Sequence, residues 1–512
     1  MTAGATMRDN APVSTITASA ATADFAWTLL TLALFAGWTF WIGSSHEAWF
    51  DEAQAWLLAR DSTPYQLLVE RVRYEGSPGL WHLILWTAIR CGLPYSLLFL
   101  ISGSFAVAGA ALILTKAPFP RWLRTGAICS YFFAYQFAAV ARSYAADLLL
   151  VPLAACFFPG RFEKPWRYAF VLGLIANLNA HGFVAAGALG VEWAWQASWR
   201  SWRRKRLPTW HVAGALAVTA FMGLCALATA WQPADNYYIR AEHSNILGTF
   251  TEILRAAFID RILVFSTARP GGLDAAAGLA LSIAAFLSLL QLILRGRYVA
   301  AGFTPLAAVL IFSVTTYASL WHGGLLFLFM LFGVWINWPE GKGSVHRDAS
   351  IALATVFVIQ AAQAGATGLW DRTHVFSPGR EAAQIMAEVR EASPQVRIAA
   401  YGYLAFSAQP WLPSNPFANY HNGSVTPAYI VWRRDETWDP FGSETMWREL
   451  LRQNPDMIVA SAPALTADRA AMIEIACQNG YAVDKALAGE LHWRGWRFAS
   501  DDLLILQHRP CV

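Results

Sequence analysis

Two adjacent carboxylates, Asp51 and Glu52, follow the aromatic pair Trp49-Phe50 a short way beyond the first apolar run of the sequence. They open a stretch with helical spacing of apolar residues, and acidic side chains in a first helical turn are stabilised by the helix dipole. A partly buried carboxylate also has the chemistry of a general base, which removes the proton of an attacking hydroxyl group. The pair fits either a helix start or a catalytic centre, with Asp51 as the base and Glu52 mainly as a positioning group.

A third candidate catalytic residue, Glu75, stands in the sequence Tyr-Glu-Gly-Ser-Pro-Gly at positions 74–79. Gly and Pro allow the backbone to turn sharply there, which can bring Glu75 back over the mouth of a cavity. A Glu in such a segment is otherwise most often a solvated loop residue. The sequence leaves both interpretations of Glu75 open.

Candidate substrate-binding side chains stand at polar breaks between later apolar runs. Arg142 and Tyr144 lie in one break and His181 in a second, while His322 precedes two glycines that permit close approach by a ligand. Polar backbone between apolar runs is tolerated where it lines a cavity or packs on protein. Arg142 equally fits an arginine that snorkels from a helix end, and His181 fits a packing histidine. Further arginines that could bind an anion follow in the segment 232–274: Arg240, Arg255, Arg261 and Arg269.

The composition places these residues in a membrane protein. Of the 512 residues, 56% are hydrophobic and only 14% are charged, whereas soluble domains have about a quarter of charged residues. The 25 Trp and 31 Phe suit membrane interfaces, where amphipathic rings lie at the level of the lipid headgroups. A net charge of +4 gives no indication of a nucleic-acid partner, so the expected surroundings are membrane lipids.

The apolar runs predict a mostly α fold, a polytopic bundle of about 11 transmembrane helices with a plausible range of 10–13. The run Gly79–Ile89 is too short to cross comfortably and is expected to form a half-buried or juxtamembrane helix. Residues 1–25 are rich in Ala, Thr and Ser and are expected to be disordered. The predicted spans are 26–44, 95–115, 125–141, 144–158, 168–180, 182–199, 210–231, 275–294, 299–318, 322–338 and 349–368.

The basic residues fix the expected orientation of the bundle. They gather in the short loops after the second, fourth, sixth, eighth and tenth spans, and cytoplasmic loops carry such an excess of Lys and Arg. The N-terminus is then cytoplasmic, whereas the first loop 45–94, the breaks at Arg142, His181 and His322, and the tail lie on the outer face. All candidate site residues are thereby expected on one side of the membrane.

The tail, residues 370–512, is expected to form a small extracytoplasmic α/β domain beyond a transmembrane domain of residues 26–369. Helix-period stretches at Arg380–Glu391 and Ala467–Asn479 alternate with strand-like runs, of which Val396–Tyr401 is the first. Its two cysteines, Cys477 and Cys511, can pair if the tail is extracytoplasmic, but the spacing alone does not distinguish a disulfide from free thiols.

The order of these features resembles the GT-C glycosyltransferases, in particular the branch of the protein mannosyltransferases and the aminoarabinose lipid A transferases. The resemblance rests on the Asp51-Glu52 pair in the first outer loop, the acidic turn at Glu75 that leads into an apolar helix, and the plan of spans followed by an outer domain. It implies a polyprenyl-phosphate sugar donor, a glycan, lipid or protein acceptor at the outer face, and a bacterial inner membrane with the tail in the periplasm. It also implies that Asp51 is the catalytic base and Glu75 the second acid.

The sequence departs from the family's pattern after Glu75. Relatives often carry Lys or His before the proline, and Gly76-Ser77 stand there instead, so the donor phosphate needs other cationic partners, for which Arg142 is the leading candidate. No metal signature is present in the sequence. Some relatives hold a divalent cation with acids of the first loop, and a cation bridged by Asp51 and Glu75 is not favoured here.

Two other functions compete with the transferase. A transporter or flippase would place ionisable residues near the bilayer midplane and broken helices in two related halves, and the sequence shows neither pattern. A non-catalytic envelope scaffold would make Asp51 dispensable.

Overall fold

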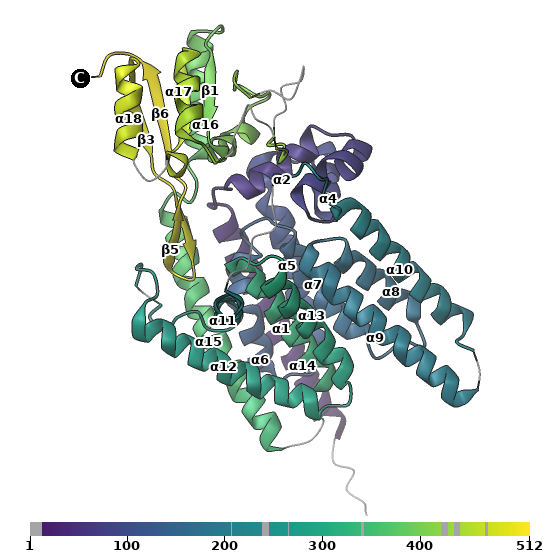
Figure 1. The fold of residues 1–512 in the computed structure, drawn as a ribbon. Coiled ribbons are helices and arrows are strands. Elements are labelled where there is room, and N and C mark those ends of the chain that lie inside the picture. The colour runs from purple at the N-terminus through teal and green to yellow at the C-terminus, as the bar shows by residue number, and fades with distance from the viewer. Residues whose placement is uncertain are drawn as a thin grey trace, which may run out of the picture.

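A bundle of long helices carries a mixed α/β domain at one end (Figure 1). The computed structural model describes residues 13–205, 207–237, 245–264, 266–338, 343–420, 429–434, 441–465 and 469–511. The helices of the bundle are α1 (Val13–Gly43), α5 (Phe99–Lys116), α6 (Arg121–Ile128), α7 (Tyr144–Phe157), α8 (Pro165–Ala176), α9 (Ala180–Arg204), α10 (Trp210–Ala230), α11 (Ile246–Ala257), α12 (Gly272–Arg295), α13 (Val299–Thr315), α14 (Gly323–Asn337) and α15 (Ser344–Thr373).

Within the described residues, six helical segments are long and apolar enough to cross a membrane. Apart from 125–141, the other predicted spans are helical too, but they are shorter or less apolar, as in the 12-residue α8. Such helices can be short because they pack among neighbours that cover their ends. The six segments are Thr22–Gly43, Tyr95–Lys116, Trp210–Ala230, Gly272–Arg295, Leu320–Asn337 and Ser344–Thr373.

Two predicted stretches differ in local structure. The predicted span 125–141 is broken, because α6 ends at Ile128 and a π-helical turn, η3 (Phe132–Gln136), follows. The helix α1 begins at Val13, so residues 13–25 of the segment 1–25 that was expected to be disordered are helical, and residues 1–12 lie outside the described residues. Ala is the best helix former, and the Ala-rich segment extends the apolar helix that follows it without a Gly or Pro.

The segment between α1 and α5 forms short helices at the junction of the bundle and the C-terminal domain (Figure 1). The 11-residue α4 is a separate helix too short to cross a membrane, as the sequence predicted. The helix α2 is buried on every side, with Trp56 packed among bundle residues and Phe50 in a core of the C-terminal domain. The elements of this segment are α2 (Phe50–Arg60), η1 (Gln66–Arg71), α3 (Val72–Glu75), α4 (Leu80–Arg90) and η2 (Tyr95–Leu97).

The C-terminal domain is built on a four-stranded sheet of order β1-β2-β6-β3. Strands β1 and β2 are parallel, and β6 pairs antiparallel with both β2 and β3. Alternate residues of β1 enter opposite cores, Ile398 on one face and Ala399 on the other, because successive strand side chains point to opposite faces. The elements are α16 (Gly379–Ala392), β1 (Ile398–Tyr401), η5 (Tyr403–Trp411), α17 (Glu444–Arg452), β2 (Met457–Ser461), η6 (Ala462–Ala464), α18 (Arg469–Gln478), β3 (Tyr481–Leu487) and β6 (Leu503–His508).

A separate β-hairpin projects from this domain towards the bundle (Figure 1). It consists of β4 (Glu490–Trp493) and β5 (Trp496–Ser500), with Trp493 opposite Trp496. The two residues between them, Arg494 and Gly495, both have positive φ angles, of 47° and 86°. Two-residue turns with this backbone match the twist of antiparallel strands, and glycine adopts it without strain.

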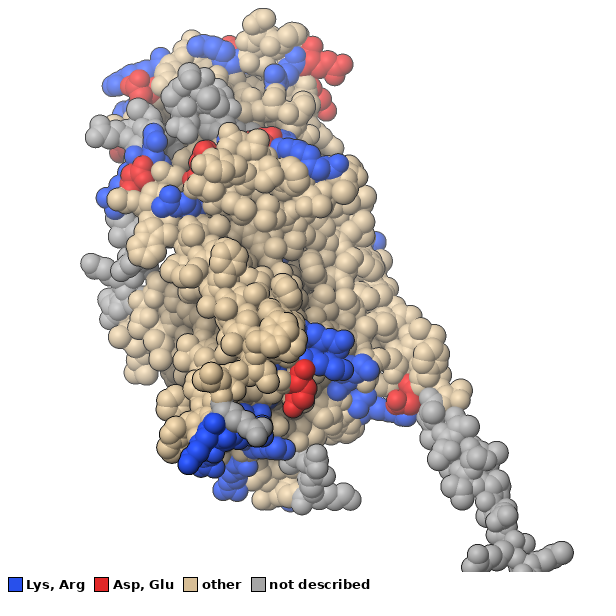
Figure 2. Space-filling view, turned by 90° about the vertical axis from the view of Figure 1, so that its right-hand side faces the viewer, with Lys and Arg blue, Asp and Glu red and all other residues tan. Residues whose placement is uncertain are grey.

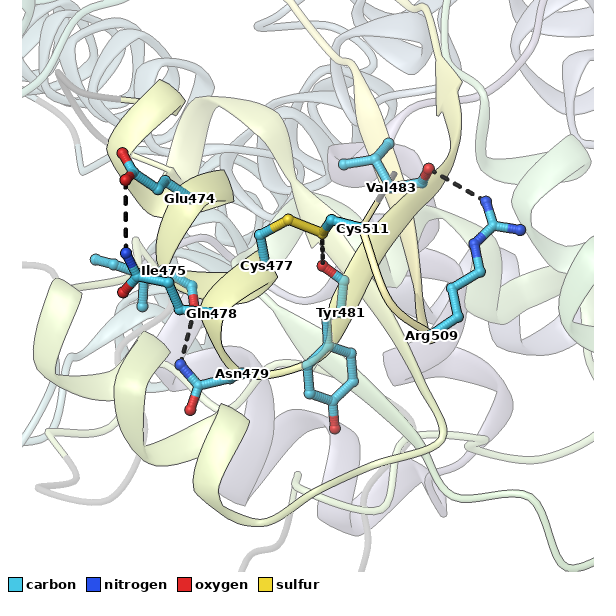
Figure 3. The surroundings of a disulfide bond; sticks show 9 residues. All are labelled: Glu474, Ile475, Cys477, Gln478, Asn479, Tyr481, Val483, Arg509 and Cys511. Atoms are coloured by element: carbon cyan, nitrogen blue, oxygen red, sulfur yellow. Dashed lines mark hydrogen bonds between the residues drawn. A yellow bond between two sulfur atoms is a disulfide. The ribbon is translucent and has the colours of Figure 1, made fainter.

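A disulfide joins Cys477 of α18 to Cys511 near the end of the chain (Figure 3). The two Cα atoms are 5.7 Å apart, and the bridge closes a loop with a sequence separation of 34 residues. The Cys511 sulfur also lies 3.2 Å from the carbonyl oxygen of Tyr481, the first residue of β3. The disulfide therefore ties the end of the chain, which follows the last strand β6, to the helix α18.

Replacing Cys477 with Ser is expected to lower the stability of the C-terminal domain. In the chain-entropy account, closure of a loop of this length stabilises the fold by at most about 4 kcal/mol. Limited proteolysis of the membrane-embedded protein would then cut the variant's C-terminal domain at a lower temperature than the wild type. A Cys225→Ser variant, which removes a free exposed thiol, serves as the control. Full alkylation of Cys477 and Cys511 in freshly isolated, unreduced protein would contradict the pairing.

Candidate functional site

The first turn of α2 places Asp51 against Arg142, which lies in the polar break between η3 and α7. The guanidinium group donates a hydrogen bond to the Asp51 carboxylate. Both side chains remain about one quarter exposed, at 27% and 26%. The guanidinium carbon also lies 5.7 Å from the ring centre of Tyr144 and 5.9 Å from that of Trp321. The pair is thus accessible to solvent, and its guanidinium group packs near two aromatic rings.

Glu52 has a different environment from its neighbour, because its side chain is only 1% exposed. One carboxylate oxygen accepts a hydrogen bond of 2.6 Å from the backbone N–H of Ala141, the residue before Arg142. The other accepts one of 3.2 Å from the backbone N–H of Trp49, as an acid in the third position of a helix often does. These contacts fix the start of α2 to the polar break, so Glu52 positions Asp51 relative to Arg142.

The carboxylate of Glu52 also begins a buried chain of polar groups. Its second oxygen lies 3.0 Å from Nε2 of His46, whose Nδ1 lies 2.8 Å from the carboxylate of Asp371 in α15. The hydroxyl group of Tyr135 donates a further hydrogen bond of 3.0 Å to Asp371. Burial alone would lower the pKa of His46, but the charges of Asp371 and Glu52 and the hydrogen bonds to both raise it well above its usual 6.5. His46 is therefore an imidazolium ion between two carboxylates.

A pocket opens beside the Asp51–Arg142 pair, where the bundle meets the C-terminal domain. The empty volume of the pocket, including the part that is open to solvent, is about 490 Å³. Most of the residues that line it are aromatic. Arg142 is the one charged side chain among the described residues that line it, because burial lowers the pKa of His492 to about 4 and leaves its ring neutral. The lining residues are Trp49, Gln136, Val140, Arg142, Tyr144, Leu320, Trp321, Phe376, Leu491, His492, Trp493 and Phe498.

Behind Tyr144 lie the two predicted histidines, both buried. The backbone N–H of Ser319 donates to Nδ1 of His322 at 2.7 Å, so Nε2 of His322 carries the proton and donates to the Tyr144 hydroxyl at 2.7 Å. The ring of His181 stacks on that of His322 with centroids 4.2 Å apart. The structure places Tyr144, His181 and His322 next to one another, and of these three only Tyr144 lines the pocket.

The two glycines after His322 serve packing between helices. A Cβ atom on Gly323 would lie 2.7 Å from the backbone of Ala256 and Ala257 in α11. A Cβ atom on Gly324 would lie 2.4 Å from the ring of Phe137. Both glycines are therefore in close contact with protein. The sequence predicted that a ligand would approach the backbone here, but α11 and aromatic residues near η3 occupy that space.

Glu75 lies apart from the pocket-lining residues. Its carboxylate accepts a hydrogen bond of 2.8 Å from the side-chain amide of Gln54, which lies one helical turn beyond Asp51. Gln54 in turn exchanges two hydrogen bonds with the backbone of Ile430, at 2.7 and 2.9 Å. Burial raises the pKa of Glu75 to about 7, against the opposite effect of its hydrogen bonds to Gln54 and Trp432. In this structure Glu75 helps to join α2 to the C-terminal domain.

The predicted arginines of the segment 232–274 have other partners or other surroundings. Arg255 is paired with Asp260 at 2.7 Å, and Arg261 lies 3.6 Å from Asp274. Arg269 is exposed and does not line the pocket in the described part of the chain. Arg240 lies outside the described residues. Of the predicted arginines that the structure describes, only Arg142 lines the pocket.

The sequence interpretation missed the hairpin residues that complete the pocket, His492 and Trp493. A signal was present, because Arg494-Gly495 stands between two short aromatic runs, a pattern typical of a two-residue hairpin turn.

Across the described ranges, no cluster of three or more His, Cys, Asp or Glu side chains is arranged to hold a metal ion.

The charged chain through His46 predicts a pH-dependent stability. Because the folded-state pKa of His46 is raised, its contribution is fully present below the unfolded-state pKa of about 6.5 and is lost as the pH rises through the folded-state value. We expect the melting temperature of the wild type to fall over that range, and that of His46→Gln to be lower at pH 6 and flatter with pH. His211→Gln, which changes an exposed histidine, should keep the wild-type profile. A wild-type profile identical to that of His46→Gln would contradict the ion chain.

The comparison with solved structures agrees with this architecture. No protein-family model matches the sequence, and no curated protein matches it either. The structure is similar to the crystal structure of ArnT from Cupriavidus metallidurans bound to undecaprenyl phosphate, with a TM-score of 0.52 and 12% sequence identity. The match covers 94% of this chain and 98% of that chain, so it includes both the bundle and the C-terminal domain. The resemblance predicted from the sequence is confirmed as a structural match: the chain is a multi-pass membrane protein with the fold of the GT-C aminoarabinose transferase ArnT.

Proposed function

We propose that the protein is a membrane glycosyltransferase that moves a sugar from a polyprenyl-phosphate donor to an acceptor at the outer face of the membrane. The observation that carries the proposal is the Asp51–Arg142 pair beside an aromatic pocket in a chain with the fold of ArnT. A carboxylate and a guanidinium group in contact supply the two charges that such a transfer needs, a proton acceptor and a partner for the leaving phosphate.

The pair also suggests an order of events. While Arg142 is bonded to Asp51, the carboxylate is partly neutralised and is a weak base. A donor phosphate that binds Arg142 competes for the guanidinium group and releases the carboxylate. Asp51 then takes the proton of the acceptor hydroxyl as its oxygen attacks the anomeric carbon. The bond from that carbon to the phosphate oxygen breaks, and the polyprenyl phosphate leaves with the electron pair, its charge stabilised by Arg142. The sugar is transferred with inversion.

The ArnT structure supports the proposed class of donor, a polyprenyl-phosphate sugar, because that protein was crystallised with undecaprenyl phosphate. A lipid-linked donor suits a pocket placed where membrane helices meet the outer domain. The acceptor, a glycan, a lipid or a protein, would enter from the side of the C-terminal domain.

The expected orientation has support from charge and from the disulfide. In Figure 2 the end away from the C-terminal domain carries Lys and Arg with few Asp and Glu, the other end mixes both signs, and a largely uncharged band lies between them. Exposed Arg203 and Arg204 at the end of α9 belong to the predicted cytoplasmic loops. The Cys477–Cys511 disulfide fits an oxidising compartment for the other end. Both point to a periplasmic site.

The role of Asp51 is tested by the Asp51→Asn variant. Because the amide cannot accept the proton, transfer of sugar from an undecaprenyl-phosphate donor should fall by about 10²- to 10⁴-fold. The measurement is sugar transfer by membranes that contain equal amounts of folded protein. Asp61→Asn changes an exposed carboxylate at the other end of α2 and should leave the rate unchanged. Full activity of Asp51→Asn would exclude Asp51 as the base, whereas absence of sugar transfer by the wild type would favour a scaffold.

The role of Arg142 is tested by the Arg142→Lys variant. Lysine keeps the charge but loses the planar fork that binds phosphate oxygens in pairs. The KM for the lipid donor should rise by about tenfold, which corresponds to the loss of one charge-assisted hydrogen bond. Arg90→Lys, which alters an exposed arginine of the same outer segment, is the control. An unchanged KM for the donor would place the phosphate elsewhere.

A further inference from the structure

One polar side chain of the pocket has no part in the transfer described above, that of Gln136. It is the last residue of the π-helical turn η3 and lines the same pocket as Arg142. Every other residue from Ser130 to Ala141 is buried. The accessible surface of this segment therefore belongs almost entirely to Gln136, and it opens into the pocket that this residue lines.

The π-helical turn brings Gln136 together with Tyr131, five residues earlier in the chain. In an α-helix, side chains three or four residues apart are neighbours, and those five apart lie on different faces. A π-helical turn is wider and bonds residues five apart, as the N–H of Phe137 and the carbonyl oxygen of Phe132 do at 3.0 Å. Across this turn the Tyr131 hydroxyl donates to the side-chain oxygen Oε1 of Gln136 at 3.0 Å. Such turns are rare and are frequent at functional sites.

The direction of that hydrogen bond is set by the C-terminal domain. At the tip of the β4–β5 hairpin, the backbone N–H of Arg494 donates to the Tyr131 hydroxyl at 3.1 Å. A backbone N–H only donates, so the hydroxyl group accepts there and gives its single proton to Gln136. The Gln136 amide is thereby held with its oxygen on Tyr131 and its nitrogen, Nε2, directed elsewhere.

The amide nitrogen of Gln136 is unpaired and accessible. Among the described residues, Nε2 has no hydrogen-bond partner. It does not belong to the unpaired side-chain atoms that are buried, so it keeps accessible surface. Because the accessible surface of Gln136 opens into the pocket, the two N–H groups of Nε2 can bind a molecule there.

Gln136 and Arg142 offer the pocket the same kind of group. Oε1 of Gln136 is occupied by Tyr131, so this side chain presents only N–H donors, and a guanidinium group has no acceptor either. Two such side chains suit a group whose oxygens only accept hydrogen bonds, as those of an ionised phosphate do. A polyprenyl phosphate that leaves has three terminal oxygens, of which a guanidinium fork binds two. A neutral donor that lines the same pocket can serve the third.

We propose that Gln136 is a second phosphate-binding residue, whose Nε2–H group donates to an oxygen of the lipid phosphate held by Arg142. Tyr131 is then a positioning residue, which keeps the acceptor of the amide away from the anion. Through the N–H of Arg494, the C-terminal domain sets the polarity of a group in the bundle wall of the pocket. This inference rests on the proposed function and adds residues that bind its donor. A sugar hydroxyl group would also accept from an amide, so the test separates phosphate from sugar.

The test measures binding of undecaprenyl phosphate to the full-length protein in nanodiscs. Gln136→Met keeps the length of the side chain and removes its donors, so the Kd should rise by about tenfold, as expected for one lost hydrogen bond to a charged group. Undecaprenol, which lacks the phosphate, should bind the wild type and this variant equally. Gln136→Glu keeps the acceptor for Tyr131 and brings a like charge to the phosphate, so its Kd should rise at least as much. This second variant decides the matter should Gln136→Met fail to fold.

Gln66→Met is the matched control, because Gln66 lies in η1 of the outer segment and does not line the pocket. It should keep the wild-type Kd. An unchanged Kd for undecaprenyl phosphate in both Gln136 variants overturns the proposal, and weaker binding of only a mannose-bearing lipid would assign Gln136 to the sugar instead. In either case weaker binding by Arg142→Lys leaves the transferase standing. Failure of the wild type to bind undecaprenyl phosphate overturns both.

The positioning role of Tyr131 is tested in two backgrounds. Tyr131→Phe frees Oε1 and lets the amide turn over, so binding of undecaprenyl phosphate should weaken, by less than in Gln136→Met. In the Gln136→Met background the same change should leave the Kd as it is, because Tyr131 acts on the phosphate only through the amide. A lower melting temperature with an unchanged Kd, or an equal loss of affinity in both backgrounds, would contradict this role.

Discussion

The carboxylate of Glu52 is the contact on which the site depends. It bonds the N–H of Ala141, which sets the backbone before Arg142, and it sits next to Asp51 on α2. Through His46 it is also tied to Asp371, near the end of α15, the helix that leads into the C-terminal domain. A buried carboxylate is costly unless it is paired, and here that cost is offset by a histidinium ion and two backbone N–H groups. Three segments distant in sequence, around His46 to Glu52, Ala141 and Asp371, are thereby held around the reactive pair.

The same requirement, that buried polar groups be paired, explains how the two domains are joined. Irregular backbone around Phe258, which leaves carbonyl oxygens without helical partners, is bonded by Gln360 and by Arg494 of the hairpin. Gln54 of α2 likewise bonds both the carbonyl oxygen and the N–H of Ile430. The bonds of Arg494 and Gln54 cross between the bundle and the C-terminal domain, whereas that of Gln360 lies within the bundle. The pocket lies at this joint, so its two walls belong to different domains and its shape depends on both.

Helix positions followed from the sequence because long apolar runs and basic loops report burial in lipid directly. Asp51 could be singled out because an acid just beyond a span is unusual, and its partner Arg142 because a cation stands at a polar break. The link of His46 to Asp371 joins residues 325 positions apart, and no local pattern encodes such a pairing. The hairpin was missed for a related reason: a short aromatic turn resembles many surface loops until its burial is known. Glu75 was expected at the cavity and instead bonds Gln54, since a flexible turn does not fix where its side chain points.

The central claim is that the Asp51–Arg142 pair opens when the donor phosphate binds. A structure of the protein with undecaprenyl phosphate measures this directly. The account predicts a phosphate oxygen within hydrogen-bonding distance of the Arg142 guanidinium group, and an Asp51 carboxylate no longer bonded to it and facing open space. A phosphate bound at another place, with the Asp51–Arg142 contact intact, would contradict it.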